Sequence, residues 1–465
     1  MDCEARLCFK KGLVRLLYNL LFPVFFLVTS PRYLWRMIRR GNWCENFGQR
    51  FGFYDRELKE WAKQQPIFWL HAVSVGEVNL AIPLLKEMEK RLPDFQFVVS
   101  TTTSTGMGQL QRGLSPTMRA VYYPVDLPWV VARAFRVFRP RCIALVEVEI
   151  WPNFIWRAAK RNVPICLVNA RLSDRSFRGY GRFGFLFRPI FSRFELVCAQ
   201  TEDDANRWRA LGCRDGSVQT CGNLKFDAVD VSSPPKVDFG KLLNDLGVAS
   251  SRRVLLGAST HIGEEKMLGE IYLRLRQENP ELFLVIVPRH MERCVHVSRE
   301  LSSVGIKCQL RTKLSDTPAE ACDCLLVDTT GELLDIYRLA EWVVMGKSFE
   351  MSPGGGQNPI EPAALGKPVF FGPRMGNFKG IVQSLLSSRG ACRVSNFTEL
   401  ERVLKTAMDS DQFKKMGRAA SMVVVRNRGT LVKTVEFLHK SVTKTCQKTC
   451  QKTCQNGLDG AEGIS

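Results

Sequence analysis

Residues 67–88 read IFWLHAVSVGEVNLAIPLLKEM, and this stretch contains the repeating unit of the fold. It begins with an apolar, β-rich run that predicts a strand ending near Val73. Gly76 then permits a sharp turn, and Glu77 opens an amphipathic helix. A strand, a turn and a helix in this order form the unit of a parallel α/β sheet. We therefore expect an α/β fold built by repeating this unit.

The same unit recurs on both sides of a break in the sequence. Strand-like runs before the break, each followed by a helical stretch, are FQFVVST (95–101), CIALVEV (142–148), PICLVNA (164–170) and FELVCAQ (194–200). Those after it are VLLGAST (254–260), LFLVIVPRH (282–290), CLLVDTT (324–330), WVVMGKS (342–348) and PVFFG (368–372). The break, AVDVSSPPKVDFG, is rich in Pro, Ser and Asp and is typical of a linker. This order predicts two doubly wound, Rossmann-like domains.

These patterns set the expected domain boundaries. We expect an anchor with a basic flank at 1–40, a first Rossmann-like domain at 41–226, a linker at 227–250, a second Rossmann-like domain at 251–440 and a low-complexity tail at 441–465. The tail repeats KTCQ and spaces Cys446, Cys450 and Cys454 by four residues.

Charge and cysteine content restrict the possible functions. Lys and Arg outnumber Asp and Glu by 66 to 46, and a net charge of +20 attracts phosphates on nucleic acids, nucleotides or anionic lipids. The basic residues are dispersed, which argues against nucleic-acid binding. Several of the 16 cysteines, such as Cys142 and Cys166, lie in apolar runs and indicate free thiols in a reducing cytoplasm. No zinc-like pair of C-x-x-C units occurs, so no metal is implied.

The N-terminal segment has the pattern of a membrane attachment. Residues 13–29 are apolar, with Lys10 and Lys11 before them and four arginines at 32–40 after them. The run is shorter than the ~20 residues that span a bilayer and is interrupted by Arg15, Asn19 and Pro23. A single span and an in-plane helix both fit, and a buried hairpin of the first domain is the alternative. The cationic flanks favour attachment to an anionic inner leaflet.

Candidate site residues follow strands, because ligands of doubly wound domains bind beyond the carboxyl ends of the strands. In the first domain these residues are Glu77, the pair Glu147 and Glu149, and Lys225. Glu77 is either a functional carboxylate or an acidic residue favoured by the helix dipole. Strand alternation would place Glu147 and Glu149 on one face, suited to proton handling or to ion pairing with arginine. Lys225 is either a cation for a phosphate leaving group or a solvated surface lysine.

The second domain offers two further groups. Ser259 and Thr260 end a strand and either bind a ligand or cap the next helix, and Arg289 follows a buried strand, where it could grip a phosphate. The stretch SPGGGQNPIEPAALGKPVFFGP is more specific, because its glycines let backbone approach a ligand and Glu361 can accept hydrogen bonds from ribose hydroxyls.

Six motifs together resemble the Kdo (3-deoxy-D-manno-oct-2-ulosonic acid) transferases of lipopolysaccharide synthesis, which form glycosyltransferase family 30. These are HAVSVGEV, VEVEIWPN, GNLKFD, ASTHIGEE, VPRH and NPIEPAALGKPV, in this order between about Trp69 and Lys379. The resemblance implies the GT-B fold, in which two Rossmann-like domains face a cleft. It also implies inverting transfer of Kdo from CMP-Kdo to a lipid A precursor, and onto Kdo already attached, without cofactor or metal.

The resemblance also assigns roles to residues. It implies that the first domain binds the acceptor, with Glu77 as general base and with Glu147, or its rival Glu149, and Lys225 supporting the transition state. It implies that the second domain binds CMP-Kdo. The residues that it assigns to CMP are Pro288, Arg289, Gly331, Glu332, Leu333, Asn358, Pro359, Ile360 and Glu361, with Ser259, Thr260, His290 and Gly356 as further possibilities. Gln357 departs from the family pattern, where histidine is common.

Two other functions compete with this one. A GT-B transferase that uses a UDP-sugar is the rival within enzymes, and it is separated by donor trials. A basic, non-enzymatic membrane or nucleic-acid-binding protein is the rival outside them, and it would show salt-sensitive RNA affinity without transfer.

Overall fold

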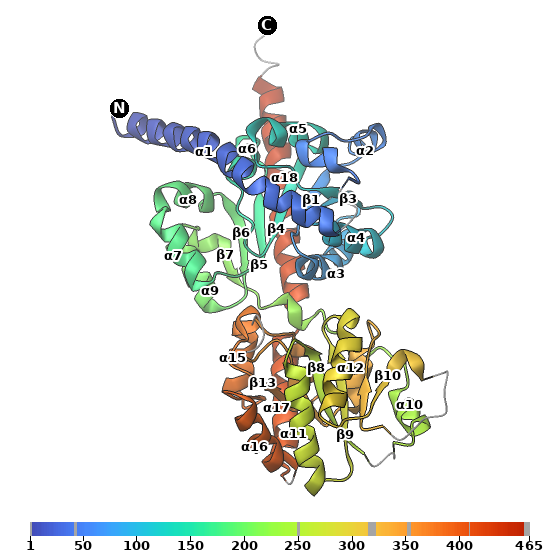
Figure 1. The fold of residues 1–465 in the computed structure, drawn as a ribbon. Coiled ribbons are helices and arrows are strands. Elements are labelled where there is room, and N and C mark those ends of the chain that lie inside the picture. The colour runs from blue at the N-terminus through green and yellow to red at the C-terminus, as the bar shows by residue number, and fades with distance from the viewer. Residues whose placement is uncertain are drawn as a thin grey trace. The chain divides into compact units, whose positions relative to one another are not determined.

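The structure is a computed structural model that describes residues 2–40, 44–248, 252–314, 322–350, 355–408 and 410–459. The chain forms two compact units (Figure 1). Unit 1 comprises Met1–Ala228 together with Gly429–Ser465, and unit 2 comprises Val229–Arg428.

Unit 1 is built on a sheet whose seven described strands run in the order β3-β2-β1-β4-β5-β6-β7. All of their pairings are parallel. The strands are β1 (Ile67–His71), β2 (Gln96–Thr101), β3 (Arg119–Tyr122), β4 (Pro140–Val146), β5 (Ile165–Ala170), β6 (Phe194–Ala199) and β7 (Val218–Thr220). The strands from β1 to β3 are added toward one edge of the sheet, and those from β4 to β7 are added toward the other. The strand order therefore reverses between β1 and β4, as in a doubly wound fold.

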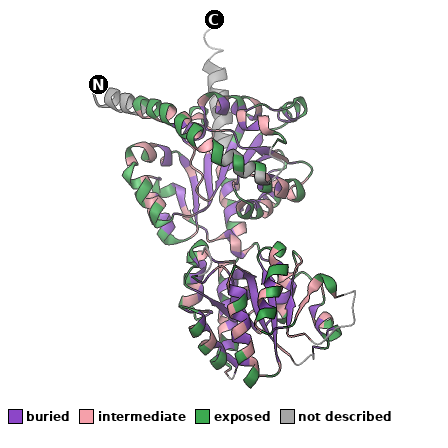
Figure 2. Ribbon diagram, in the orientation of Figure 1, coloured by how far each residue is buried: buried purple, intermediate pink, exposed green. Residues whose placement is uncertain are grey.

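Helices cover both faces of this sheet. They are α1 (Asp2–Arg40), α2 (Arg56–Trp61), α3 (Val75–Arg91), α4 (Ser104–Gly113), α5 (Pro128–Phe138), α6 (Pro152–Lys160), α7 (Asp174–Arg182), α8 (Gly184–Phe191), α9 (Glu202–Ala210) and α18 (Thr430–Asp459). The described residues of unit 1 also form three 3-10 turns, η1 (Phe47–Phe51), η2 (Asp215–Ser217) and η3 (Leu224–Phe226). Strand β1 shows why both faces need cover: Trp69 packs into one core cluster and Phe68 into the other. Both are completely buried, as Figure 2 shows for the strands in general.

The C-terminal helix α18 belongs to unit 1, which corrects the expected domain boundary at 440. Its buried residues Val435, Leu438 and Val442 pack into the same cluster as α3, α4 and strands β1, β2, β4, β5 and β6. Asp227 ties the start of this segment to the end of the first passage through unit 1, because its carboxylate accepts from the backbone N–H of Gly429 (2.8 Å) and Leu431 (2.8 Å). The strand pattern stops before this segment, so no pattern in the sequence indicated the return to unit 1.

We expect Leu438→Ala to destabilise unit 1 by about 2–5 kcal/mol, because it removes a completely buried side chain and leaves a cavity. Denaturant unfolding of the purified protein measures this. The matched control is Val432→Ala on the same helix, whose side chain is 48% exposed and should cost far less. Equal costs for the two variants would contradict the packing of α18 on unit 1.

Unit 2 repeats the architecture. Its seven described strands run in the order β10-β11-β9-β8-β12-β13-β14, again with parallel pairings. They are β8 (Arg253–Thr260), β9 (Leu282–Pro288), β10 (Cys308–Leu310), β11 (Cys324–Leu326), β12 (Trp342–Met345), β13 (Val369–Phe371) and β14 (Ala391–Arg393). The helices are α10 (Phe239–Asp245), α11 (Glu264–Glu278), α12 (Cys294–Ser303), α13 (Leu333–Leu339), α14 (Ile360–Ala364), α15 (Lys379–Ser387), α16 (Phe397–Met408) and α17 (Gln412–Asn427).

The expected linker at 227–250 is in part folded into unit 2. Helix α10 lies within it, and Phe239 and Leu243 of this helix are buried. The carboxylate of Asp335 on α13 accepts from the backbone N–H groups of Lys236 (3.0 Å) and Val237 (3.2 Å), which fastens the segment just before α10. The Pro- and Ser-rich composition did not indicate these contacts, because the residue that the segment binds, Asp335, lies about a hundred residues further along the chain.

Candidate active site

Glu77 lies at the beginning of α3, directly beyond the carboxyl end of β1. Ser74 caps the helix, and its hydroxyl accepts from the Glu77 N–H (3.3 Å) and donates to Glu77 Oε1 (2.7 Å). Glu77 Oε2 accepts from the backbone N–H of Val73 (2.9 Å). This is a capping box, so the carboxylate has a structural role in closing the helix end. An ionised carboxylate has about four acceptor positions, and these contacts leave others for a ligand.

The environment of Glu77 favours proton uptake. Burial raises the pKa of this carboxyl, and the negative charge of Glu147 raises it further, while the bonds from Val73 and Ser74 counteract both effects. A carboxylate that is half-buried, held in one orientation and raised in pKa is suited to accept a proton in catalysis.

Glu147 and Lys225 form an ion pair at the carboxyl ends of β4 and β7. The distance from Lys225 Nζ to Glu147 Oε1 is 3.7 Å, and both side chains are partly buried. Lys225 lies in η3, where the Asn223 side chain caps its backbone N–H (3.0 Å). The sequence had suggested an arginine as the simple partner of the carboxylate pair, whereas the structure supplies the lysine that the resemblance placed in the same site.

Glu149 is held by a neighbouring indole. Trp151 Nε1–H donates to Glu149 Oε2 at 3.0 Å. Burial and the charges of Glu77 and Glu147 raise the pKa of Glu149 to about 7, although the Trp151 bond lowers it. Three carboxylates and one ammonium thus act on one another in unit 1.

The expectation that strand alternation brings Glu147 and Glu149 to one face is wrong. Strand β4 ends at Val146, and Glu147 adopts a left-handed backbone conformation with φ of 59°. Non-glycine residues with positive φ are strained and cluster at functional sites. Asn169 at the end of β5, Ser259 at the end of β8 and Lys347 after β12 share this conformation, so it recurs at the carboxyl ends of central strands.

In unit 2, Glu264 joins two of the loops that follow strands. Its carboxylate accepts from the backbone N–H groups of His261 (2.9 Å), Lys347 (2.7 Å), Ser348 (3.1 Å) and Phe349 (3.3 Å). Ser259 and Thr260 do not cap the next helix. The N-cap of α11 is Gly263, which has no side chain to cap with. The Thr260 hydroxyl is buried, and no hydrogen-bond partner for it is found in the described residues.

Arg289 and Glu361 lie at the same edge of the unit 2 sheet, close enough for their charges to interact. The backbone N–H of Arg289 donates to Thr260 O (3.0 Å), and its side chain and that of His290 are exposed. Burial raises the pKa of the Glu361 carboxyl, while the bond from Asn358 Nδ2 (3.2 Å) and the charge of Arg289 lower it. The exposed guanidinium of Arg289 follows β9, and the half-buried carboxyl of Glu361 precedes β13.

The remaining residues predicted to bind CMP fall in two segments. Gly331, with φ of 87°, precedes Glu332 and Leu333 at the start of α13, and Glu332 is engaged by Thr329 (2.5 Å) and Arg311 (3.5 Å). Pro359 and Ile360 begin α14, and the Ile360 N–H donates to Asn358 Oδ1 (3.2 Å).

Only part of the glycine run is described, because residues 351–354 lie outside the described residues. Gly356 has φ of 70°, and a Cβ on it would lie 2.2 Å from the Met375 sulfur, so no larger residue fits. The close approach that this glycine allows is therefore to Met375, on the chain that follows β13.

Comparison with known proteins shows which family the chain belongs to. The family described as 3-deoxy-D-manno-octulosonic-acid transferase (kdotransferase) matches residues 45–228. A 3-deoxy-D-manno-octulosonic acid transferase of Haemophilus influenzae is 30% identical over 88% of this chain and 92% of its own length. One of Bordetella pertussis is 31% identical over 87% of this chain and 94% of its own length. This chain belongs to the Kdo transferase family.

Solved structures support the fold of this Kdo transferase family member. A glycosyltransferase from Rickettsia africae matches 82% of this chain and 99% of its own with a TM-score of 0.54, at 13% sequence identity. The two parallel sheets, each wound on both sides, are those of the GT-B fold. The family is one of glycosyltransferases, so the chain is an enzyme of that class.

Sequence reasoning missed the residues that support the carboxylates. Asp126, which is 1% exposed, accepts from the backbone N–H groups of Asn153 (2.9 Å) and Phe154 (2.9 Å) and so caps α6, the helix that follows Glu149. Trp151 holds Glu149 directly. No local sequence pattern indicates that Asp126 caps α6, because α5 and β4 lie between this residue and the helix that it caps.

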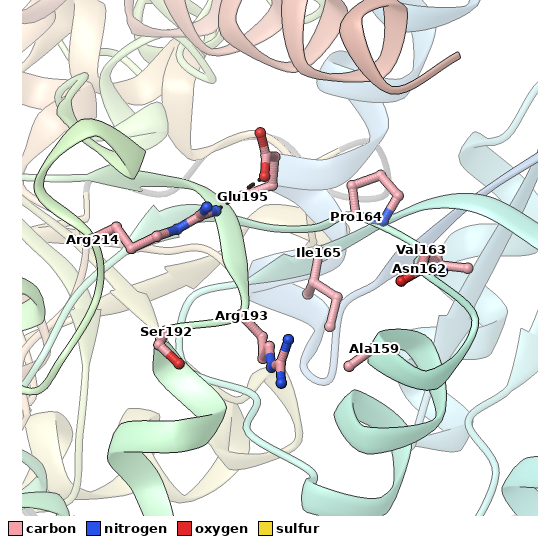
Figure 3. A pocket seen from close by; sticks show the side chains of 9 residues that line it. All are labelled: Ala159, Asn162, Val163, Pro164, Ile165, Ser192, Arg193, Glu195 and Arg214. Atoms are coloured by element: carbon pink, nitrogen blue, oxygen red, sulfur yellow. Dashed lines mark hydrogen bonds and ion pairs between the residues drawn. The ribbon is translucent and has the colours of Figure 1, made fainter. Parts of the chain in front are cut away.

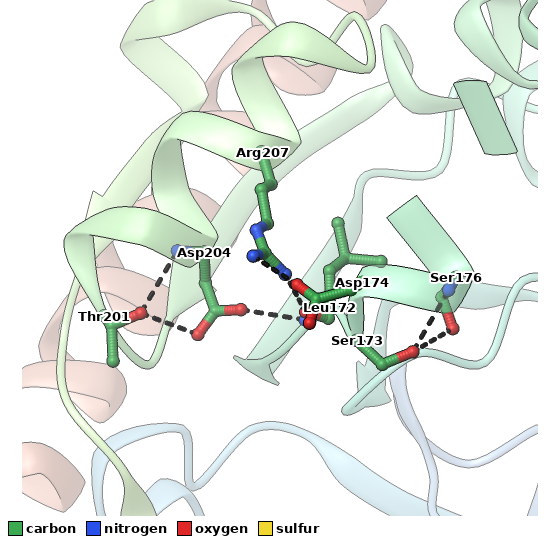
Figure 4. Close-up of polar contacts among 7 residues, drawn as sticks. All are labelled: Leu172, Ser173, Asp174, Ser176, Thr201, Asp204 and Arg207. Carbon is green, nitrogen blue, oxygen red and sulfur yellow. Dashed lines mark hydrogen bonds and ion pairs between the residues drawn. The ribbon is translucent and has the colours of Figure 1, made fainter. Parts of the chain in front are cut away.

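A side-chain network fixes the loop after β5 (Figure 4). Asp204 and Arg207 of α9 reach the turn before α7: Asp204 Oδ1 accepts from the Leu172 N–H (2.9 Å), and Arg207 donates to Leu172 O (2.7 Å) and to Asp174 (2.6 Å). These contacts hold the start of the arginine-rich α7 against α9.

A pocket of about 320 Å³ (Figure 3) lies at the amino ends of strands β5 and β6, at the edge of the unit 1 sheet opposite to Glu77 and Lys225. Ile165 at the start of β5 and Glu195 near the start of β6 line it, together with Arg193 and Arg214. Glu195 is paired with Arg214 at 3.0 Å. The pocket is therefore separate from the candidate active site, which lies at the carboxyl ends of the strands.

Proposed function

We propose that this enzyme transfers Kdo from CMP-Kdo to a lipid A precursor with inversion, and adds Kdo to Kdo already attached. The observation that carries the proposal is the group of Glu77, Glu147, Glu149 and Lys225 at the strand ends of unit 1, on the positions that the family resemblance assigns. The relatives that are about 30% identical over most of the chain are named as 3-deoxy-D-manno-octulosonic acid transferases, which supports Kdo as the group transferred.

In the proposed reaction, a hydroxyl of the acceptor attacks the anomeric carbon of Kdo. Glu77 takes the hydroxyl proton, the new carbon–oxygen bond forms, and the bond from the anomeric carbon to the CMP phosphate breaks with its electron pair leaving on CMP. Lys225, oriented by its ion pair with Glu147, supports the negative charge that develops. The proposal routes no step through a metal or cofactor, as the resemblance implies.

Unit 2 is the proposed site of the donor. The Arg289 guanidinium is exposed beside a carboxyl of raised pKa, so it is placed to hold the CMP phosphate while Glu361 accepts from ribose hydroxyls. Glu264 keeps the neighbouring loops in register by accepting four backbone N–H bonds.

Attachment to the cytoplasmic side of the bacterial inner membrane is part of the proposal. Residues Gly12–Arg32 of α1 are long and apolar enough to cross a membrane by length and composition, with mean hydropathy 1.8, although a signal sequence would pass the same test. Exposed Arg175, Arg178 and Arg182 of α7 adjoin exposed Phe183 and Phe185, which suits an anionic membrane surface and a phosphorylated lipid acceptor.

Donor selectivity tests the proposal. We expect CMP release with CMP-Kdo and lipid A precursor, and no turnover with UDP-sugars under the same conditions. Turnover with a UDP-sugar and none with CMP-Kdo would replace this function with that of another GT-B transferase.

A further inference from the structure

We propose that helix α1 is a working part of the candidate active site, in which Tyr18 and Phe22 are positioning residues that hold Trp151 and, through it, the Glu149 carboxylate. In this arrangement α1 lies along the membrane surface with one face on unit 1. The proposal rests on the proposed function and goes beyond it, because membrane attachment alone requires no contact between α1 and the site.

Two hydrogen bonds, together called the polar latch, fix α1 to the rest of unit 1. The Tyr18 hydroxyl donates to Asp126 Oδ2 at 2.8 Å, and Asn153 Nδ2 donates to Asn19 Oδ1 at 2.8 Å. Asp126 and Asn153 are 1% and 2% exposed and Tyr18 and Asn19 are half-buried, so both bonds are partly shielded from water. Buried polar groups need hydrogen-bond partners, and α1 supplies two of them. Asp126 also caps α6, so the latch bears directly on the helix that follows the Glu149 loop.

An aromatic contact continues from the latch to the carboxylate. Phe22, 9% exposed, packs with Leu127 and Val130, and its ring meets Trp151 edge-on with 6.3 Å between centroids. Trp151 Nε1–H donates to Glu149 Oε2. Tyr18 stacks on Phe22 at 5.3 Å, so the latch and the aromatic contact support each other. Each step in this series is a direct contact within unit 1.

The distribution of exposure around α1 fits a helix lying in the plane of the membrane. Residues Arg15, Tyr18, Asn19, Phe22 and Phe26 contact unit 1 at helical spacing. The opposite side exposes large apolar side chains, at 56–75% for Leu16, Leu20, Leu21, Val24, Leu27 and Val28. A spanning helix would have lipid on all sides over this length, whereas one side of α1 is covered by the rest of unit 1 and the other side is left exposed. Lipid is therefore the proposed occupant of the exposed face.

Phe22→Ala is the direct test, measured on the full chain with CMP-Kdo and lipid A precursor. We expect kcat to fall about three- to tenfold while the KM for CMP-Kdo stays unchanged, because the ring contact orders Trp151 and not the donor. The enzyme should still sediment with vesicles of anionic phospholipid. Phe25→Ala is the matched control, since this side chain is 63% exposed on the same helix and lies outside the cluster around Phe22.

Trp151→Phe keeps an aromatic ring and removes the N–H donor, so it separates positioning from loss of packing. The Trp151 bond lowers the pKa of Glu149, and its loss raises that pKa above about 7. Glu77, Glu147, Tyr123 and Tyr180 also act on Glu149. A Glu149 that keeps its proton to higher pH no longer repels the ionised form of Glu77, so the acid limb of the kcat profile, which reports the base, should move to lower pH. Phe22→Ala should move the limb in the same direction.

Three outcomes decide the proposal. An active wild type whose Phe22→Ala and Phe25→Ala variants have equal kcat and equal pH profiles would overturn it. An unfolded Phe22→Ala variant leaves the Trp151→Phe profile as the deciding measurement, and an unmoved acid limb there would also overturn it. A wild type without activity on CMP-Kdo would instead reject the proposed function.

Discussion

Replacement of Glu77 by Gln lowers kcat for Kdo transfer by about 10²–10⁴-fold, because the amide cannot accept the proton of the attacking hydroxyl. The amide keeps the size of the side chain and an oxygen that can accept from the Val73 N–H, so α3 should remain capped. Initial-rate kinetics with saturating CMP-Kdo measure the effect, and thermal unfolding shows whether the fold is retained.

Ser74→Ala is the matched control for the structural role of Glu77. It removes the hydroxyl that caps α3 and contacts Glu77 Oε1, at a cost of about 1 kcal/mol in stability. The Glu77 carboxylate and its bond from Val73 remain, so most of the activity should remain too. If Ser74→Ala and Glu77→Gln lose stability and activity in parallel, Glu77 is a helix cap and not the base.

Lys225→Met should have the second-largest effect, a loss of about 10²–10³-fold in kcat, since it removes the cation assigned to the charge of the departing phosphate. The side chain keeps its length and apolar stem, and the Asn223 cap of the backbone is untouched. The loss of the partner of Glu147 (3.7 Å) also leaves three carboxylates acting on one another without their ammonium.

Lys63→Met is a suitable control, because its side chain is 65% exposed and pairs with Glu60 in a surface contact. A Lys225→Arg variant, which restores the charge, should recover part of the lost rate. If Lys225→Met retains more than about a tenth of the wild-type rate, the transition-state role assigned to it is contradicted.

Much of the fold was accessible from the sequence, because buried parallel strands are near-continuous apolar runs. All ten strand-like runs form strands, and IFWLHAV contains β1. The strands that were missed are β3, β7, β10 and β14, each of three or four residues and at or next to a sheet edge. RAVY and VQT are too short and too polar to give a strand signal. Helix α18 was assigned to the wrong unit, since a helical pattern does not say which sheet it covers.

The places of the candidate residues after strands were predictable from the sequence, whereas their mutual geometry was not. Glu77 and Lys225 do follow strands as expected, and strand ends meet at one edge of a parallel sheet, while their roles stay predictions. The relation of Glu147 to Glu149 was wrong, since it assumed an extended backbone where Glu147 is left-handed. Contacts such as Tyr18 to Asp126 join residues 108 positions apart, and no local pattern encodes them.

The most direct test of the central claim is mass analysis of the lipid formed from CMP-Kdo and a tetraacylated lipid A precursor. The wild-type enzyme should yield a lipid heavier by one or more whole Kdo residues, with CMP released in equal number, and Glu77→Gln should yield almost none. An unmodified lipid with folded wild-type enzyme, or an undiminished product with Glu77→Gln, would contradict the account.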